Sequence, residues 1–532
     1  MVEPILDMMY KWWKPNVSAV TRASITEIEI LDSYMPDASV TVKDSWDASA
    51  AADGSVMCYV IGTKLIIAGN GSGRIHLNEK GQCLFADADN DNYFTNVTSI
   101  NGLSLLDLSK TTALSFMFYG CRSLTSLDLS GFVTSHVSYF QNMFSECKSL
   151  TSLDLRSFDT SNALNTSSMF SGCSSLALLD ISSFRLPLVT FTMLMFQSGE
   201  EVQRNIIFPT DGFRLAGNCW GMFQNNLITS VDTSNWDTSA CTSMNALFSG
   251  CKNLSGIDVS NWDVSNVTDM QFMFYGCSSI GEIDVSNWDV SKVTSFDHFA
   301  AHANLKRKGI ENWKTTSATN MNALFHNCAE EELDLSGWDV SKNQFFCQMF
   351  ENSPNLKRIK GLEKWNTSAG LGFDGMFERC SKLEEVDLSS FNTTKAKNGT
   401  SASTNGHKTA TLQNMFLSCN NLKKVSVGPN FAVNGNGSNT TAANKLILPT
   451  PSTDYIEGAD GNWYAFNGDP YAPNAIPDKT ADTYFASFPL CQNEDVIVKN
   501  GSLIDTAKAI KEKNGATAKY TPAQFGAAIR AL

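Results

Sequence analysis

The stretch IDVSNWDVSNVTDMQFMFYGCSSI, from Ile257 to Ile280, decides the fold because variants of it recur along most of the chain. Its most regular residue is a phenylalanine, usually in a Met-Phe pair, which we call the landmark phenylalanine. Successive landmarks lie 25 to 27 residues apart, with a last step of 39. They are Phe118, Phe144, Phe170, Phe196, Phe223, Phe248, Phe274, Phe299, Phe325, Phe350, Phe377 and Phe416. This period is typical of a solenoid, whose coils bury their apolar sides against their neighbours.

Two periodicities alternate within each repeat. In segments such as 127–130 and 333–336, apolar residues two apart flank an aspartate, which predicts a short strand with one buried face. The following segment has apolar residues at helical spacing, which predicts an amphipathic helix. In the opening stretch these are Val267, Met270, Phe274 and Cys277. The predicted fold is an α/β solenoid, a leucine-rich-repeat-like array of about 12 coils, each with a short parallel strand and a helix.

Five regions are expected along the chain, and the two ends are expected to cap the solenoid. The early stretch alternates apolar and polar residues and predicts antiparallel strands, whereas the last thirty residues predict a pair of helices. Trp12 and Trp13 either pack on the following domain or anchor the chain to a partner. The expected regions are an N-terminal helix or anchor (1–20), a small β domain (21–100), the solenoid (101–430, with a polar loop at 395–408), a β-rich closing cap with hairpins (431–490) and a C-terminal helix-turn-helix module (491–532, helices near 503–513 and 521–532).

Composition and charge exclude several classes of protein. The net charge is −14, with 40 Lys and Arg against 54 Asp and Glu, which argues against a nucleic-acid partner. No apolar run reaches the length of a membrane span, and the first residues do not resemble a signal peptide. We therefore expect a chain made in the cytoplasm and released by another route.

Eight of the 14 cysteines share one repeat position, three residues after the landmark phenylalanine. They are Cys121, Cys147, Cys173, Cys251, Cys277, Cys328, Cys380 and Cys419. Gly199, Asn226, His302 and Ser353 take this position in other repeats. The pattern indicates a slot for a small buried side chain, which is the usual role of a free cysteine, and not a column of disulfides or metal ligands.

An aspartate between the two apolar residues of the predicted strand is the candidate binding residue. Period-two geometry directs it outward, on the face opposite the core. It either accepts hydrogen bonds from nearby serine hydroxyl and backbone N–H groups, or forms an acidic groove that binds cations or hydroxyl-rich glycans. The candidate residues are Asp128, Asp154, Asp180, Asp232, Asp258, Asp284, Asp334 and Asp387, and Asp107 shares their position.

Other recurring residues give weaker functional signals. A tryptophan column, which includes Trp262 and Trp288, alternates with phenylalanine at one repeat position, which favours core filling over a sugar-stacking platform. His298 and His302 have the i, i+4 spacing of zinc ligands, but their repeat is degenerate. No catalytic triad, phosphate-binding loop or carboxylate pair stands out. We predict no catalytic residue, no metal ligand, no cofactor and no enzyme activity.

Two resemblances give these observations a biological setting. The repeat LDLSxFxTSxVxxxxxMFxxCxSL, over about residues 100 to 430, resembles that of the BspA-like leucine-rich-repeat surface proteins, which implies adhesion and surface recognition. The segment SLIDTAKAIKEKNGATAKYTPAQFGAAIRAL, from Ser502 to Leu532, resembles a short module of bacteriophage tail and baseplate proteins.

Together these resemblances imply a non-enzymatic, tail-associated protein that binds a host bacterium. The expected partners are other tail or baseplate proteins, a glycan or protein receptor on the bacterial surface, and further copies of the same chain. The expected location is the virion tail. The alternatives are a bacterial cell-surface or secreted adhesin and, from another class, a tail-associated enzyme that cleaves glycans.

Overall fold

A computed structural model describes residues 3–7, 9–86, 93–199, 203–396, 412, 414–433, 446–466 and 468–487. The chain divides into two compact units, unit 1 from Met1 to Trp288 and unit 2 from Asp289 to Leu532. The C-terminal module predicted at 491–532, with its two helices, lies outside the described residues, as do residues 397–408 of the predicted polar loop.

The predicted α/β solenoid is wrong, because the described residues contain no α-helix and their strands form small separate sheets. Short 3-10 turns are the helical elements of this part of the chain. They are η1 (Met9–Trp12), η2 (Arg22–Ser24), η3 (Leu103–Leu105), η4 (Ile310–Asn312) and η5 (Leu362–Lys364). None of the described segments forms an apolar helix long enough to cross a bilayer.

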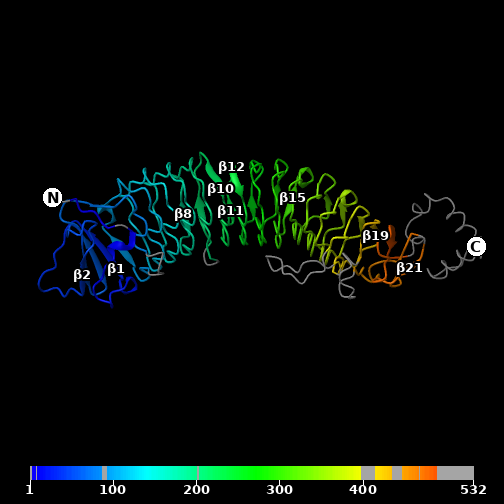
Figure 1. Ribbon diagram of the computed structural model, residues 1–532, viewed down its shortest axis with the longest axis horizontal. Coiled ribbons are helices and arrows are strands. Elements are labelled where there is room, and N and C mark those ends of the chain that lie inside the picture. The colour runs from blue at the N-terminus through cyan, green and yellow to red at the C-terminus, as the bar shows by residue number, and fades with distance from the viewer. Residues whose placement is uncertain are drawn as a thin grey trace, which may run out of the picture. The chain divides into compact units, whose positions relative to one another are not determined.

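Unit 1 begins with a five-stranded sheet in the order β2-β3-β4-β1-β6. Its strands are β1 (Glu27–Leu31), β2 (Asp44–Asp47), β3 (Met57–Ile61), β4 (Lys64–Ala68) and β6 (Ser99–Asn101). β3 is antiparallel to both β2 and β4, whereas β1 is parallel to both β4 and β6. Figure 1 shows β1 and β2 near the N-terminus. The sheet is thus mixed, and the prediction that its strands are all antiparallel is wrong.

The aromatic N-terminal segment packs on this sheet region. Trp12 is fully buried, and its indole Nε1 donates to the carbonyl oxygen of Leu84 at 2.8 Å. The Trp12 ring stacks on Phe94 with centroids 6.3 Å apart, and Arg22 lies over Trp13. Of the two sequence interpretations, packing on the following domain therefore holds for Trp12, although the predicted helix is reduced to the single turn of η1.

The repeats of unit 1 contribute short strands that pair in parallel between successive coils. These strands are β5 (Ile75–His76), β7 (Leu106–Asp107), β8 (Leu178–Asp180), β9 (Asn205–Ile207), β10 (Phe213–Asn218), β11 (Ser230–Val231), β12 (Trp236–Ser243), β13 (Gly256–Ile257) and β14 (Glu282–Asp284). The parallel pairs are β5–β7, β8–β9, β10–β12 and β11–β13.

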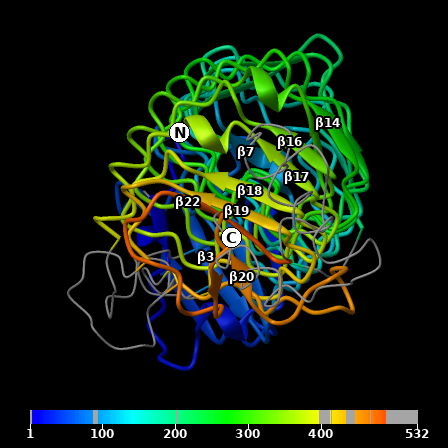
Figure 2. The ribbon, with the colours of Figure 1, turned by 90° about the vertical axis from the view of Figure 1, so that its right-hand side faces the viewer.

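The strands of unit 2 are β15 (Lys306–Lys308), β16 (Glu332–Asp334), β17 (Arg358–Lys360), β18 (Glu385–Leu388), β19 (Lys424–Val427), β20 (Trp463–Tyr464), β21 (Pro470–Tyr471) and β22 (Asp482–Phe485). β16–β17 and β18–β19 pair in parallel, and β16 to β19 follow one another in Figure 2. β22 then pairs antiparallel with β19, and β20 and β21 extend that sheet. β22 thus covers the edge of β19, the last parallel strand.

A ladder of turns replaces each predicted helix. The N–H groups of Phe116 and Phe118 donate to the carbonyl oxygens of Gln141 and Met143 in the next repeat, at 3.0 and 2.9 Å. The N–H of Met117, between them, donates backward within its own repeat at 3.2 Å. An α-helix would direct all of these donors to its own carbonyl groups. Alternate donors are instead shared with the neighbouring repeat, so a helix does not form.

Left-handed backbone conformations enforce these turns. In most repeats the residue two before the landmark phenylalanine has positive φ, as at Phe116 (60°), Asn142 (58°) and Ser168 (55°). Such conformations are costly for residues other than glycine, by about 1–2 kcal/mol each. The hydrogen bonds between repeats offset that cost. Because the apolar spacing of these turns matches that of a helix, the periodicity did not distinguish the two.

Columns of stacked aromatic rings form the core of both units. In unit 1, Phe118, Phe144 and Phe170 stack with centroids 5.7 and 5.8 Å apart and nearly parallel planes. In unit 2, Phe350 stacks on Phe377 in the same way, at 5.4 Å and 3°. The landmark phenylalanine is therefore a core residue. Stacking against the neighbouring repeat is how each coil buries it.

Candidate binding surface on the outward strand face

Three-residue strands such as β16 present two side chains to solvent and bury the one between them. In β16, Glu332 and Asp334 are exposed while Leu333 is buried, and β17 repeats the pattern. We call the residue before the buried one the leading position and the residue after it the trailing position. These two positions in all repeats form the outward strand face.

The predicted aspartates occupy the trailing position and point outward. Asp128, Asp154, Asp232, Asp258, Asp334 and Asp387 are exposed, and Asp107, Asp180 and Asp284 are half-buried. Ile207, Lys360 and Ser426 take this position where the strand pairing places them opposite Asp180, Asp334 and Asp387. The aspartates therefore form interrupted runs and not one continuous ladder.

Each aspartate closes a local turn with the residue two positions later. Asp258 Oδ1 accepts the backbone N–H of Ser260 at 3.0 Å and its hydroxyl at 2.6 Å. Asp232 accepts the same two bonds from Ser234, at 3.1 and 2.7 Å. These are the serine and backbone hydrogen bonds of the first sequence interpretation. Within the described part of the chain, Oδ2 of Asp232 and of Asp258 has no protein partner.

The same bonds hold these carboxylates in the ionised form. The serine hydroxyl, and then the backbone N–H, lowers the pKa of Asp232 and of Asp258 below the ordinary value. The nearby Asp284 opposes the shift at Asp258, because two like charges disfavour ionisation. Both side chains are therefore negatively charged at neutral pH.

Asp232, Asp258 and Asp284 form what we call the carboxylate run of unit 1. The leading positions of the same strands hold Ser230, Gly256 and Glu282, none of which is basic. Adjacent parallel strands lie about 4.8 Å apart, so the carboxylates recur at roughly that interval. No lysine or arginine forms an ion pair with Asp232 or Asp258 in the described residues. Within the described residues, Asp232 and Asp258 of this run therefore carry negative charge that no cationic side chain compensates.

Earlier in unit 1, Arg156 compensates the aspartates. Its guanidinium bonds Asp154 Oδ2 at 2.6 Å and lowers the pKa of Asp154 to about 2. Asp154, Arg156 and Asp180 help line a shallow hollow of about 300 Å³ on the outward strand face. Past Asp180, the exposed Ile207 interrupts the aspartates.

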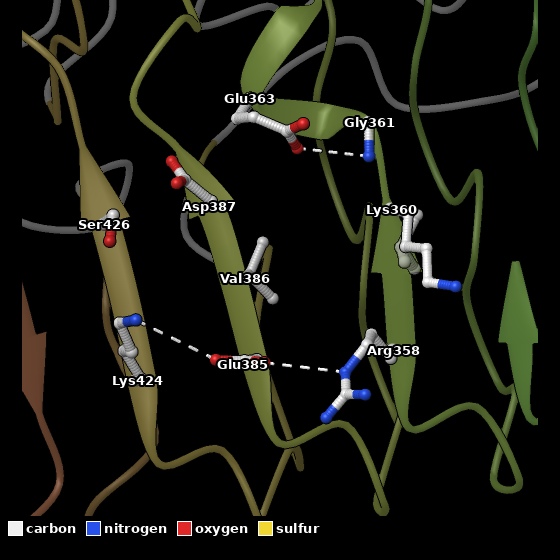
Figure 3. Close-up of a pocket in the computed structure, with 10 residues that line it drawn as sticks. Arg358, Lys360, Gly361, Glu363, Glu385, Val386, Asp387, Lys424 and Ser426 are labelled. Carbon is white, nitrogen blue, oxygen red and sulfur yellow. Dashed lines mark hydrogen bonds and ion pairs between the residues drawn. The ribbon is translucent and has the colours of Figure 1, made fainter. Parts of the chain in front are cut away.

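Unit 2 carries alternating charges at the leading positions, and we call Glu332, Arg358, Glu385 and Lys424 its charge ladder. Arg358 lies 3.7 Å from Glu332 and 3.5 Å from Glu385, and Lys424 lies 3.9 Å from Glu385. Figure 3 shows Glu385 between the two cations, beside a hollow of about 270 Å³. Such exposed pairs stabilise a fold weakly, by roughly 0–1 kcal/mol each. Because its two carboxylates alternate with two cations, the ladder carries little net charge.

The leading positions were not identified from the sequence. The signal was present, because each of these residues lies two positions before the trailing residue and alternation places both on one face. Arg358 and Glu385 were overlooked because the leading position has no recurring residue type, unlike the repeated aspartate. The trailing Lys360 was overlooked because it replaces that aspartate.

The tryptophan column lies in the core. Trp262, Trp313 and Trp365 are at most 2% exposed, and Trp236 stacks on Trp262 with centroids 5.8 Å apart. A buried ring cannot offer its face to a sugar. The structure therefore confirms core filling over the sugar-stacking interpretation.

The cysteine slot holds a hydrogen-bond donor as well as a small side chain. Cys277 Sγ donates to the carbonyl oxygen of Phe248, the landmark of the preceding repeat, at 3.1 Å. Where cysteine is replaced, Asn226 Nδ2 and Ser353 Oγ donate to the equivalent carbonyl groups at 2.8 and 3.0 Å. Cys147, Cys173, Cys251, Cys380 and Cys419 make the same bond. Burial raises the pKa of Cys277 to about 12.

In one repeat of unit 2, the landmark position in the structure lies one residue later than the repeat pattern of the sequence indicates. Positive φ occurs at His298, directly before Phe299, and the N–H of Ala303 donates to Ala300 as the slot cysteines do to their landmarks. Ala300 therefore replaces Phe299 at the landmark position, and Ala303 replaces His302 in the slot. The single-residue shift explains why this repeat appeared degenerate.

That shift brings histidine rings together. The rings of His302 and His326 have centroids 4.5 Å apart, and His298 Nδ1 lies 2.7 Å from Asp297. Burial, followed by the nearby His302 and His298, lowers the pKa of His326 to about 4. No group of three metal-ligating side chains with the geometry to hold an ion occurs among the residues that the structure describes.

Comparisons with known proteins identify the repeat. Residues 88–208, 217–332 and 296–415 match the family described as "Mycoplasma protein of unknown function, DUF285". Among solved structures, the TLR13–ssRNA13 complex is similar over 62% of this chain and 49% of that chain, at 13% identity. Its TM-score of 0.15 is too low to support any argument about function. A comparison with curated proteins gave no match.

The family matches cover more than half of the chain. They support the predicted relation to BspA-like leucine-rich repeats as a family relation, although the described repeats contain turns in place of the expected helices. They contain no information on a phage setting. This chain is a member of the DUF285 family of repeat proteins.

Proposed function

We propose that this chain is a non-enzymatic recognition protein that binds a hydroxyl-rich glycan of a bacterial surface along the carboxylate run of unit 1. One observation carries the proposal. Successive repeats present ionised carboxylates, each fixed through Oδ1 by its own turn, and Oδ2 of Asp232 and of Asp258 has no partner among the described residues.

Such a row suits a polymer of hydroxyl groups. An ionised carboxylate is a strong acceptor, and a hydrogen bond to a charged group contributes about 1.5–3 kcal/mol. Because the turn already orders each side chain, binding costs little side-chain entropy. A neutral glycan fits better than an acidic one, because uncompensated aspartates repel anionic polymers.

Replacement of these aspartates by asparagine tests the contribution of their charge alone. Asparagine makes the same turn elsewhere in this chain, since Asn366 Oδ1 accepts the N–H of Ser368 at 3.1 Å. The variant Asp232→Asn with Asp258→Asn therefore keeps the local hydrogen bonds and removes two charges. A matched control is Asp159→Asn with Asp237→Asn, because these aspartates close the same turn outside the run.

The test measures retention of bacteria on surfaces coated with the protein. Because each lost charge-assisted bond contributes about 1.5 kcal/mol or more, we expect retention to fall at least tenfold for the run variant and to stay unchanged for the control. Periodate treatment of the cells, which cleaves sugar diols, should abolish retention, while protease treatment should not. Retention that is sensitive to protease alone would show a protein receptor, and unchanged retention by the run variant would refute the proposal.

The proposed setting is a bacteriophage tail, where the chain would contact both tail proteins and the host surface. Its support is the tail-like segment from Ser502 to Leu532. Immunogold labelling of purified particles tests this setting, and labelling confined to bacterial cells would indicate a cell-surface adhesin instead. Release of soluble oligosaccharide by the purified protein would contradict the non-enzymatic part of the proposal.

A further inference from the structure

Two cysteines of unit 1 lie outside the slot and meet each other. Cys241 belongs to β12, and Cys219 directly follows β10, the strand that pairs with β12 in parallel. The pairing is irregular here: Gly217 lies opposite Cys241 and Asn218 opposite Ser243, so β12 has one extra residue. This bulge changes the direction of the side chains locally. It explains how two neighbouring strands bring their thiols together.

The two sulfur atoms are 2.9 Å apart, and both side chains are fully buried. The backbone holds them there, because the N–H of Cys219 donates to the carbonyl oxygen of Ser243 at 3.0 Å. A disulfide bond measures about 2.0 Å, so the sulfurs need to approach by less than about 1 Å. Seven of the eight slot thiols differ, since their sulfur donates to the carbonyl oxygen of an earlier phenylalanine and not to another sulfur.

We propose that Cys219 and Cys241 are a covalent modification site, at which a small-molecule disulfide oxidises the two thiols to a cystine that joins β10 to β12. The proposal is independent of glycan binding. It does not extend to the slot cysteines, because none of them has another sulfur as its hydrogen-bond partner within the described residues.

The reaction is a pair of thiol–disulfide exchanges. The Cys219 thiolate attacks one sulfur of the small disulfide, forms a mixed disulfide and releases one small thiol. Cys241 then attacks the Cys219 sulfur, forms the protein disulfide and releases the second small thiol. Each protein thiol passes one proton to a departing thiolate, so two cysteine thiols and one small disulfide give one cystine and two small thiols.

The local chemistry assigns the order of attack. The hydrogen bond from Cys241 lowers the pKa of Cys219 despite its burial, while the same contact raises the pKa of Cys241. Cys219 is therefore the first nucleophile and Cys241 the resolving thiol. Because both are buried, the oxidant reaches them when the chain opens locally or before folding is complete.

The test treats the full chain with oxidised glutathione and counts thiols after unfolding. We expect two fewer reactive thiols than the 14 of the reduced chain. Cleavage before Asp232 and Asp237 separates the two cysteines, so the oxidised chain should give one pair of peptides joined by a disulfide. The joined peptides should separate after reduction.

Variants identify the sulfurs involved. Cys219→Ser and Cys241→Ser should each abolish the loss of two thiols. Cys251→Ser is the matched control, because Cys251 falls on the same cleavage fragment as Cys241 but donates to Phe223, and it should retain the cross-link. A cross-link that persists in Cys219→Ser, or an oxidised wild-type chain that keeps all its thiols, would overturn the proposal. The peptide map of the wild-type chain decides the question even if a variant fails to fold.

Discussion

In the carboxylate run of unit 1, Asp232 and Asp258 lie in successive repeats, and no lysine or arginine in the described part of the chain pairs with them. In the charge ladder of unit 2, Arg358 lies between Glu332 and Glu385 within 3.7 Å of each. Each set of residues occupies the outward strand face of its own unit, over a column of stacked aromatic rings. The buried residues of a repeat thus maintain the fold, while its two outward residues vary and set the local charge.

The largest expected effect tests whether the cores of the two units are equivalent. Phe248→Ala in unit 1 and Phe350→Ala in unit 2 each remove a fully buried ring from a stacked column. Each should lower the free energy of unfolding by about 3–5 kcal/mol. Urea titrations followed by circular dichroism measure this loss. A large loss at only one of the two sites would show that the cores are not equivalent.

The next effect is a loss of stability at acidic pH that arises from unit 2. His326 of unit 2 has a folded pKa of about 4, against 6.5 when exposed, because of burial and the nearby His302, His298 and Arg379. The folded state therefore disfavours the protonated ring. Its full contribution to stability is present above about pH 6.5 and is lost as the pH falls toward 4, by an amount on the order of 3 kcal/mol.

The measurement is a series of urea titrations between pH 7 and pH 4. His326→Gln should flatten the loss of stability in this range, whereas His136→Gln, which alters an exposed histidine of unit 1, should not. An unchanged pH profile in His326→Gln would assign the loss to other groups.

A smaller effect tests the donor in the cysteine slot. Cys277 of unit 1 donates through sulfur, and Ser353 of unit 2 donates through oxygen to the equivalent carbonyl group. Cys277→Ala should lower the free energy of unfolding by about 1–3 kcal/mol, because it leaves the Phe248 carbonyl without this bond. Cys277→Ser should cost less. Equal stability of the two variants in thermal unfolding would show that size alone governs the slot.

The smallest expected effect comes from adding a cation to the carboxylate run, which makes it more similar to the charge ladder of unit 2. Gly256 is a leading position with an ordinary backbone conformation and open space for a side chain. Gly256→Lys should exceed the control Gly256→Ala in stability by about 0.2–1 kcal/mol at low salt, by pairing with the neighbouring aspartates. The difference should vanish in concentrated salt. Urea midpoints of both variants at two salt concentrations measure it, and a difference unaffected by salt would rule out the electrostatic explanation.

The repeat period, the buried landmark phenylalanines and the outward aspartates could be predicted from the sequence, because burial in a repeat follows periodicity directly. The helix could not be excluded in this way. Whether Met117 donates within its repeat, and Phe118 outside it, depends on φ values that apolar spacing does not specify. The charge ladder was accessible in principle, but pairs such as Arg358 and Glu385 lie 27 positions apart and have meaning only once the register is known.

The alternating pattern of backbone donors also governs how such a chain changes length. Since every repeat gives half of the hydrogen bonds of its turn segment to the following repeat, as Phe116 and Phe118 do, a whole unit inserted between two others finds matching acceptors on both sides. A single inserted residue does not, because it displaces the left-handed positions on which the turns depend. Duplication of entire repeats is therefore the route by which this architecture can be extended, and each copy adds two surface positions that are free to diverge.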